Sequence, residues 1–172
     1  RESEGLKRYV FRFGVLPLGR TMRLNLEFAN IPSHRHGPAI MRLPPWNPAV
    51  KVELPVEILA DKIVAVAFRE YVKGRDVWDI AYLSRDLNQT ADVVLIGRKV
   101  ADYGYGLDDF RERIVVAARR IYWEGAEPLT REMTRFLPTG VASLYLPRAR
   151  DMAREVGASL MSVAASVAEL EA

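Results

Sequence analysis

The sequence predicts an α+β fold, in which short antiparallel strands precede a mainly helical bundle. Two observations support this prediction. Apolar and polar residues alternate with a period of two within residues 6–29, which is typical of strands. After Pro55, apolar residues recur at helical spacing almost to the end of the chain. We therefore expect a first part, residues 1–54, with a hairpin and a proline-rich loop, and a helical domain, residues 55–172.

Local signals place the strands. Residues 6–29 form two alternating runs separated by the turn-compatible string "GVLPLGR", which predicts an antiparallel hairpin. Five prolines and Gly37 fall within residues 30–48, and proline removes backbone donors, so an extended loop is expected there. Residues 50–54, "VKVEL", are expected to form one more short strand.

The helices follow from periodicity and from glycine and proline positions. Pro55 suits the first position of a helix, where a missing N–H costs nothing. We expect this helix over residues 55–73, with its apolar stripe centred near Ile63 and its end at Gly74. A shorter helix is expected at 76–84. Further helices are predicted at 90–102, 107–124, 128–136 and 147–170.

Composition excludes several classes of protein. The 172 residues are 49% hydrophobic and 27% charged, which is globular rather than disordered. A net charge of +3 permits a polyanionic partner without requiring one. Cysteine is absent, so there is no disulfide framework and no thiolate zinc site. No apolar run reaches the roughly 18 residues of a membrane span, and these features fit a cytoplasmic protein.

Three charged residues near the first two helices have competing interpretations. Lys62 lies at the edge of the apolar stripe, where it could hold its ammonium group in a cleft or be solvated like most surface lysines. Asp76 precedes a helix and is followed by Asp79, three residues later, as in a capping box. The two acids could therefore form a helix cap, part of an active site, or both.

The stretch "ELPVEILADKIVAVAFREYVKGRDVWDIAYL", from Glu53 to Leu83, resembles the signature of the AbiEii/AbiGii-type nucleotidyltransferase toxin family, within the polymerase-β-like nucleotidyltransferase superfamily. The family pattern joins "E-x-L-A-x-K" to "R-D-x-x-D-[LI]-x-x-L". Its fixed positions are occupied here by Glu57, Leu59, Ala60, Lys62, Arg75, Asp76, Asp79, Ile80 and Leu83.

The resemblance implies a toxin of a bacterial toxin–antitoxin or phage-defence pair that transfers a nucleotide from an NTP to an acceptor, such as RNA or the 3′ end of tRNA. It implies that Lys62 contacts the triphosphate, that Arg75 binds substrate, and that Asp76 is catalytic, as a base or as an orienting acid. Asp79 is a further candidate. Mg²⁺ would be the cofactor, and a cognate antitoxin would be a partner. Residues 1–54 would be the remainder of a nucleotidyltransferase sheet.

One part of the superfamily pattern is absent. A "G-S" turn followed by an "Asp-x-Asp" pair should hold the metal ions, and no such string occurs in the sequence. Either this motif precedes Arg1 or the protein never had it, and we expect the chain alone to transfer no nucleotide. Glu27 is a candidate for a third carboxylate near the metals, although an exposed strand acid is the simpler interpretation.

Other motifs are weaker. His34 and His36 are spaced to share a metal ion, but no third ligand is evident. A basic and aromatic patch on helix 107–124 could bind RNA or be a solvated face: Arg111, Arg113, Arg119, Arg120, Tyr122 and Trp123. The last helix carries an apolar stripe that predicts a packing face or a face for a partner helix: Met152, Val156, Leu160, Val163, Val167 and Leu170.

Two alternative functions remain open. The chain could be a non-catalytic binding module with the same fold, or an unrelated α+β domain that binds nucleic acid. In the last case Lys62 and Asp76 should not meet.

Overall fold

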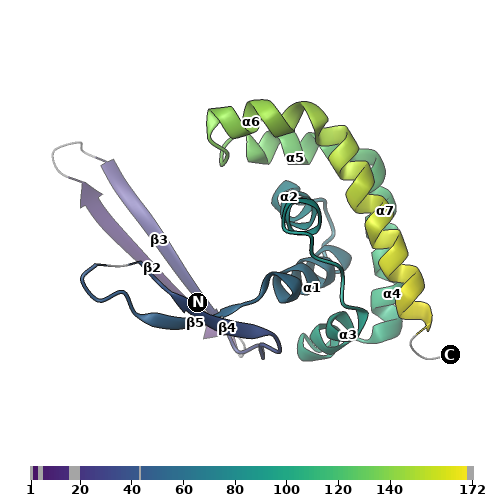
Figure 1. Ribbon diagram of the computed structural model, residues 1–172, viewed down its shortest axis with the longest axis horizontal. Coiled ribbons are helices and arrows are strands. Elements are labelled where there is room, and N and C mark those ends of the chain that lie inside the picture. Colours follow the sequence, from purple (N-terminus) through teal and green to yellow (C-terminus); the bar gives the residue numbers. More distant parts are fainter. Residues whose placement is uncertain (1, 4–5, 16–19, 43, 170–172) are drawn as a thin grey trace. The chain divides into compact units, whose positions relative to one another are not determined.

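A computed structural model describes residues 2–3, 6–15, 20–42 and 44–169. The chain forms two compact units, Arg1–Pro32 and Ser33–Ala172, which are described separately. The fold is α+β, as the sequence predicts: two small antiparallel sheets and a set of helices (Figure 1). Among the described residues, no helix combines the length and the apolarity that crossing a membrane requires.

The first unit is a hairpin. It pairs β2 (Leu6–Val15) with β3 (Arg20–Ala29), and β1 (Glu2–Ser3) extends the sheet beside β2. The predicted hairpin is thus confirmed, while the centre of its turn, 16–19, lies outside the described residues. Residues directly opposite each other share a face, so one face is apolar: the pairs are Tyr9–Leu26, Phe11–Leu24 and Phe13–Met22.

The second unit begins with a two-stranded sheet of β4 (His36–Ile40) and β5 (Ala49–Glu53). The expected strand at 50–54 is therefore present, but the expectation of a continuous loop over 30–48 is wrong at β4. Pro38 sits opposite Lys51 in this strand. A strand of a two-stranded sheet has one unpaired edge, and such an edge tolerates proline.

The helix α1 (Pro55–Ala67) begins at the expected proline but ends six residues earlier than the predicted 73. Residues 68–73 contain no glycine or proline, so the sequence carries no stop signal there. Gly74 begins α2 (Gly74–Ala81) and does not end α1, and a π-helical turn, Tyr82–Asp86, continues α2.

Gly74 is required by a close approach between α2 and α5. A Cβ added at this position would overlap the carbonyl oxygen of Pro128 and lie 2.8 Å from Leu129 Cα. We expect Gly74→Ala to lower the free energy of unfolding by about 1–3 kcal/mol, measured by urea denaturation, because backbone atoms must shift. The control is Gly97→Ala inside α3, where a Cβ meets nothing within 4 Å. This change should stabilise the protein by about 0.5–1 kcal/mol. Equal effects at the two positions would contradict the prediction.

The remaining helices agree with expectation except at some ends. Helix α4 has the predicted bounds, α3 and α5 differ from them by two or three residues, and the short helix α6 was not predicted. Their bounds are α3 Val93–Asp102, α4 Leu107–Glu124, α5 Ala126–Met133, α6 Thr139–Tyr145, a 3₁₀ turn Leu146–Arg148, and α7 Ala149–Ala168.

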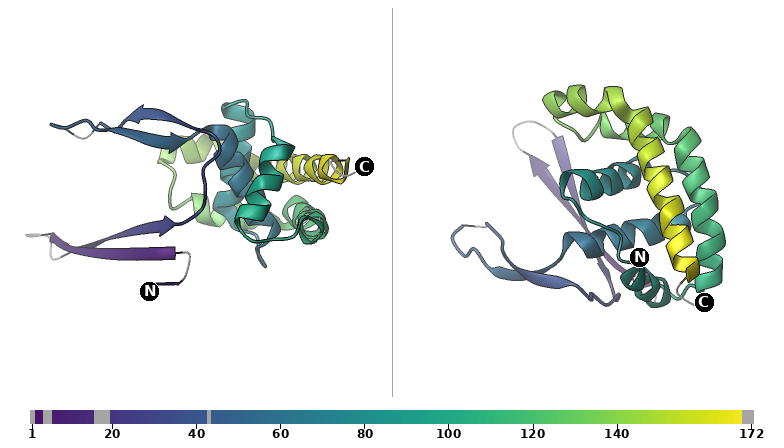
Figure 2. Two further views of the ribbon diagram at one scale, coloured as in Figure 1. Left: turned by 90° about the horizontal axis from the view of Figure 1, so that it is seen from below. Right: turned by 45° about the vertical axis from the view of Figure 1, so that its right-hand side comes forward.

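The core of the second unit lies between the helices. Helices α4 and α7 run side by side, and α1 and α2 pack against this pair (Figures 1 and 2). The stripe predicted on the last helix is a packing face, since its described members are all buried: Met152, Val156, Leu160, Val163 and Val167. Leu170 lies outside the described residues.

Candidate phosphate-binding site

Lys62 and Asp76 meet in an ion cluster between α1 and α2. Lys62 Nζ lies 3.1 Å from Asp76 Oδ1 and 2.5 Å from Asp79 Oδ2. On the other side of Asp76, Arg69 Nε lies 2.7 Å from Oδ2. The prediction that Lys62 and Asp76 face each other is confirmed. The alternative of an unrelated domain predicted that the two side chains lie apart, and the structure contradicts that prediction.

Burial differs sharply within this cluster. The side chain of Asp76 is 1% exposed, that of Lys62 28% and that of Asp79 36%. Asp76 is therefore a buried anion held between two cations, and Asp79 lies on the solvent side. Burial lowers the pKa of Lys62, but the hydrogen bond and charge of Asp79 and the charge of Asp76 outweigh burial, and the pKa is raised. Lys62 is thus a stable cation.

The helix-cap interpretation of Asp76 is wrong. The N-cap of α2 is Lys73, whose side chain makes no capping bond, and Asp76 lies inside the first turn. A residue from α5 holds this end of the helix: Glu132 accepts hydrogen bonds from the backbone N–H groups of Gly74, at 3.1 Å, and Arg75, at 3.2 Å. The carboxylate satisfies two of the unpaired donors that begin every helix.

Two of the other predicted site residues have other partners. The Arg75 side chain is exposed, and its guanidinium group lies 5.1 Å from the centre of the Phe136 ring. Glu27 belongs to the hairpin unit, where it pairs with Arg8 at 2.8 Å and is about half exposed. This geometry favours the exposed-acid interpretation of Glu27.

The weaker motifs also have other partners. His34 Nε2 lies 2.7 Å from Asp102 Oδ2, so that nitrogen faces a carboxylate. Within the described ranges, neither histidine belongs to a group of potential metal ligands. In the basic patch of α4, Arg111 pairs with Asp108 and Arg113 with Asp109, which leaves less unpaired positive charge than the sequence suggests.

A second ion cluster, missed from the sequence, lies at the other end of α1. Lys99 of α3 is fully buried, and its Nζ lies 2.6 Å from Glu57, 3.2 Å from Asp61 and 3.7 Å from Glu53. Burial lowers the pKa of Lys99, but Glu57 and Asp61 outweigh burial and raise it. The sequence did contain a signal: Glu57 and Lys99 both fall among buried apolar positions of their helices, and a buried charge needs a partner.

Glu57 also fixes the segment before β4. Its carboxylate accepts hydrogen bonds from Ser33 Oγ and from the backbone N–H groups of His34 and Arg35. Burial raises the pKa of Glu57, but the hydrogen bonds from Lys99 and from this segment outweigh burial and lower the pKa to about 2. These bonds attach the segment that leads into β4 to the helices of the second unit. The boundary between the two units falls between residues 32 and 33. The sequence-based prediction grouped residues 1–54 together.

The carboxylates around Lys99 do not fit a divalent metal. Oxygen atoms of Glu53, Glu57 and Asp61 lie within 4.8 Å of one another, a spacing that could hold an ion. The ammonium group of Lys99 already sits among them and is fully buried. A cation in this place neutralises the acids and repels a second one.

Comparison with known proteins identifies a family. A family model described as "Nucleotidyl transferase AbiEii toxin, Type IV TA system" matches residues 4–152, a range that includes both ion clusters. No curated protein and no solved structure matches.

Proposed function

Because the chain belongs to the AbiEii nucleotidyltransferase toxin family of type IV toxin–antitoxin systems, we propose that it carries the phosphate-binding half of a site that transfers a nucleotide from an NTP to RNA, such as tRNA. The observation that supports this proposal is the cluster of Lys62, Asp76 and Arg69, in which a buried carboxylate holds two partly exposed cations.

The geometry suits phosphate binding. Lys62 is held from the inside by Asp76, and its other contact, Asp79, is partly exposed. A triphosphate that approaches from solvent would replace Asp79 as the partner of Lys62. Nucleotidyl transfer depends mainly on positioning and on charge stabilisation, so a preset cation contributes directly. Asp76, bound through one oxygen to each cation, orients Lys62.

The remainder of the site is proposed by analogy with the family. We propose that Mg²⁺ is the cofactor in the complete enzyme and that its ligands lie mostly outside these 172 residues, because the "G-S…D-x-D" motif is absent from them. The metal would neutralise developing negative charge on the phosphates. We further propose a cytoplasmic enzyme, regulated by a cognate antitoxin, in a system of the phage-defence type.

The test is an incubation of the complete protein with each labelled NTP, Mg²⁺ and total tRNA. We expect labelled RNA, and a loss of about 10²-fold or more when Lys62 is replaced by glutamine, since a misplaced or missing positioning group costs about this much. Arg98→Gln, an exposed cation on α3, is the matched control and should label RNA normally.

Three outcomes would each contradict a part of the proposal. Labelling by Lys62→Gln at the rate of the control would remove Lys62 from the chemistry. A complete protein that labels no RNA with any nucleotide would favour the non-catalytic binding module. Robust labelling by the 172-residue chain alone would show instead that its metal-binding carboxylates lie within it.

A further inference from the structure

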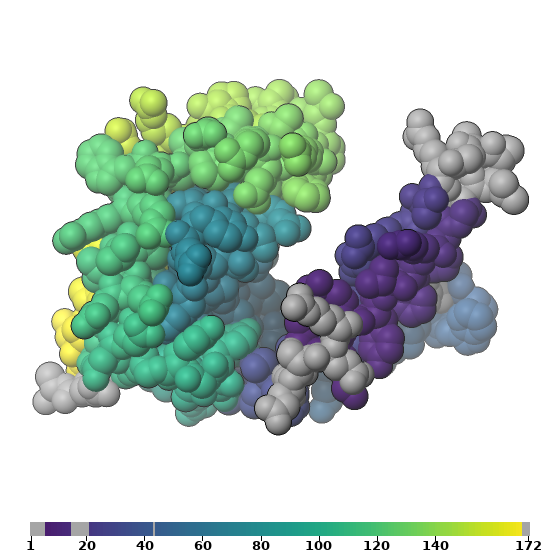
Figure 3. Space-filling view, turned by 180° about the vertical axis from the view of Figure 1, so that it is seen from behind, coloured from purple at the N-terminus to yellow at the C-terminus, as the bar shows by residue number. Residues whose placement is uncertain are grey.

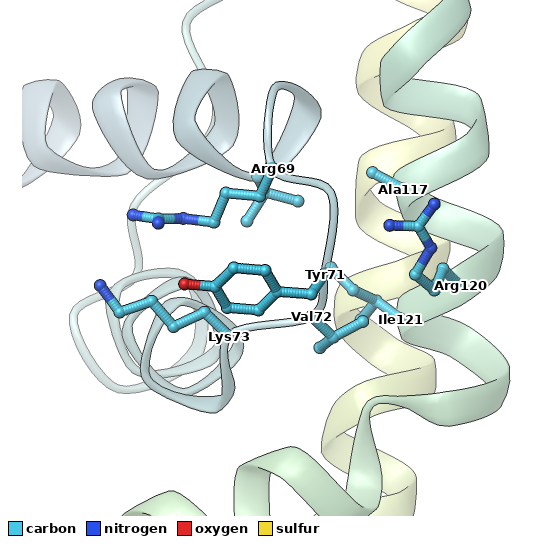
Figure 4. A pocket seen from close by; sticks show the side chains of 8 residues that line it. Arg69, Tyr71, Val72, Lys73, Ala117, Arg120 and Ile121 are labelled. Atoms are coloured by element: carbon cyan, nitrogen blue, oxygen red, sulfur yellow. The ribbon is translucent and has the colours of Figure 1, made fainter.

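The segment between α1 and α2 presents two cations and a tyrosine in a row. Figure 4 shows the Tyr71 ring between the side chains of Arg69 and Lys73, with the polar ends of all three on the same side. All three line one small cavity, and Tyr71 is 63% exposed. On the face seen in Figure 3, atoms of the α1–α2 region (blue-green) reach the surface beside those of later helices (green).

The row carries unneutralised positive charge. Arg69 is paired with Asp76, but Lys73 forms no ion pair with any described residue. Burial lowers the pKa of Lys73, and the neighbouring cations Arg69, Arg75 and Lys62 lower it further, against the opposite effect of Asp76. Mutual repulsion of this kind is relieved when an anion binds.

The segment is held in place from several sides. Arg120 of α4 donates a hydrogen bond to the backbone oxygen of Glu70, and Val72 packs against the core. Glu132 fixes the backbone after Lys73. A segment fixed in this way loses little conformational entropy when it binds a ligand.

The cavity beneath the row is too small for a nucleotide. Its volume is about 10 Å³ and its base is apolar, formed by Val66, Val72, Ala117 and Ile121. Such a space holds about one water molecule. A ligand must therefore lie across the exposed groups of the row and not inside it.

We propose that Arg69, Tyr71 and Lys73 bind the single-stranded end of the nucleic acid acceptor, with a base stacked on Tyr71 and phosphates on the two cations. An exposed aromatic ring between cations is the combination that binds unpaired nucleotides, because every base offers a face for stacking and duplex bases do not. Arg69 links the row to Asp76, at 2.7 Å, so a strand bound here ends beside Lys62. This inference rests on the proposed function, and it names the side chains that hold the acceptor strand.

A second surface offers similar residues but fewer cations. Trp123 on α4 is 75% exposed beside Arg119, over a groove of about 350 Å³ with a mainly apolar lining. The residues that line this groove do not include Lys62 or Asp76. Trp123 therefore provides a matched control for Tyr71.

The experiment measures binding of a fluorescein-labelled ten-nucleotide single-stranded RNA to the 172-residue chain by anisotropy. We expect Tyr71→Ala to weaken binding about 5- to 150-fold, the range for one stacked base, and Tyr71→Phe to restore it. Lys73→Gln should weaken binding and reduce the dependence of log Kd on log salt by about 0.7, as expected for one lost phosphate contact to a single strand. Trp123→Ala should bind like the wild type.

A second binding measurement uses ATP in place of RNA as the ligand. Lys62→Gln should weaken ATP binding and leave RNA binding intact, while Tyr71→Ala should do the opposite. An equal loss of ATP and RNA binding in Tyr71→Ala would assign the row to the incoming nucleotide and overturn the proposal. RNA binding at the wild-type affinity by both Tyr71→Ala and Lys73→Gln would also overturn the proposal. A loss of RNA binding in Trp123→Ala alone would overturn it too, because it would place the RNA on α4.

These results separate the two proposals. RNA binding that depends on Tyr71, in a protein that transfers no nucleotide, would reject the proposed function and keep the nucleic acid site. Nucleotide transfer to RNA with no effect of Tyr71 on binding would keep the proposed function and reject the site.

Discussion

Replacing Asp76 with asparagine is expected to lower the rate of nucleotide transfer by the complete protein about 100-fold or more. The two oxygens of Asp76 each contact a different cation, Lys62 and Arg69. An amide offers one oxygen and one N–H₂ group, so one cation would face a donor and move away. Displacement of a positioning group by about 1 Å is sufficient for a loss of this size. Initial rates with labelled NTP, well below the melting temperature, give the measurement.

Stability provides the control for this variant. Asp76 is not an exposed cap that asparagine could replace, because its charge compensates two partly buried cations. Removing this charge should therefore also lower the melting temperature. Asp76→Glu keeps the charge and should recover part of the stability. Asp109→Asn, which breaks an exposed pair with Arg113, should change stability by less than about 1 kcal/mol and leave the rate unaltered. A rate for Asp76→Asn equal to that of Asp109→Asn would refute a role in catalysis.

Replacing Lys99 with methionine is expected to lower the free energy of unfolding by about 3–5 kcal/mol, the usual cost of removing one partner from a buried ion pair. Methionine has a similar length but no charge, and it would leave Glu57 fully buried and Asp61 nearby without their cation. Since domains are stable by only about 5–15 kcal/mol, the effect should be evident in urea denaturation followed by circular dichroism.

A double variant isolates the interaction. The double variant Glu57→Gln/Lys99→Met should lose less stability than the sum of the two single variants. Each single change leaves the charge of the other residue without its partner, whereas the double variant removes both charges. Lys51→Met replaces an exposed lysine of β5 and should change stability by no more than about 0.5 kcal/mol. Additive effects of the Glu57 and Lys99 changes would show that the two side chains do not stabilise each other.

The sequence predicted features that depend on neighbours along the chain. The start of α1 at Pro55 and the bounds of α4 follow from proline chemistry and apolar spacing. The pairing of Lys62 with Asp76 was predicted because both belong to one motif, 14 residues apart.

Features that depend on distant residues were missed. The early end of α1 is associated with a hydrogen bond from Arg120 to the backbone oxygen of Glu70. No glycine or proline near this end of the helix indicates it in the sequence. Arg69 was not recognised as a partner of Asp76, and Glu132 holds Gly74 from 58 residues away. Contacts of this kind arise from tertiary packing, which a single sequence does not reveal.

The close approach at Gly74 has a mechanical consequence. The backbone of α2 at Gly74 is in direct contact with Pro128 of α5. Glu132 of α5 also accepts hydrogen bonds from the first turn of α2, so the two helices are held together at this turn. A displacement of α5 is therefore expected to move the first turn of α2, which also carries Asp76, the partner of Lys62. The position of Lys62 is thus linked, through Asp76, to the packing of α5 against α2.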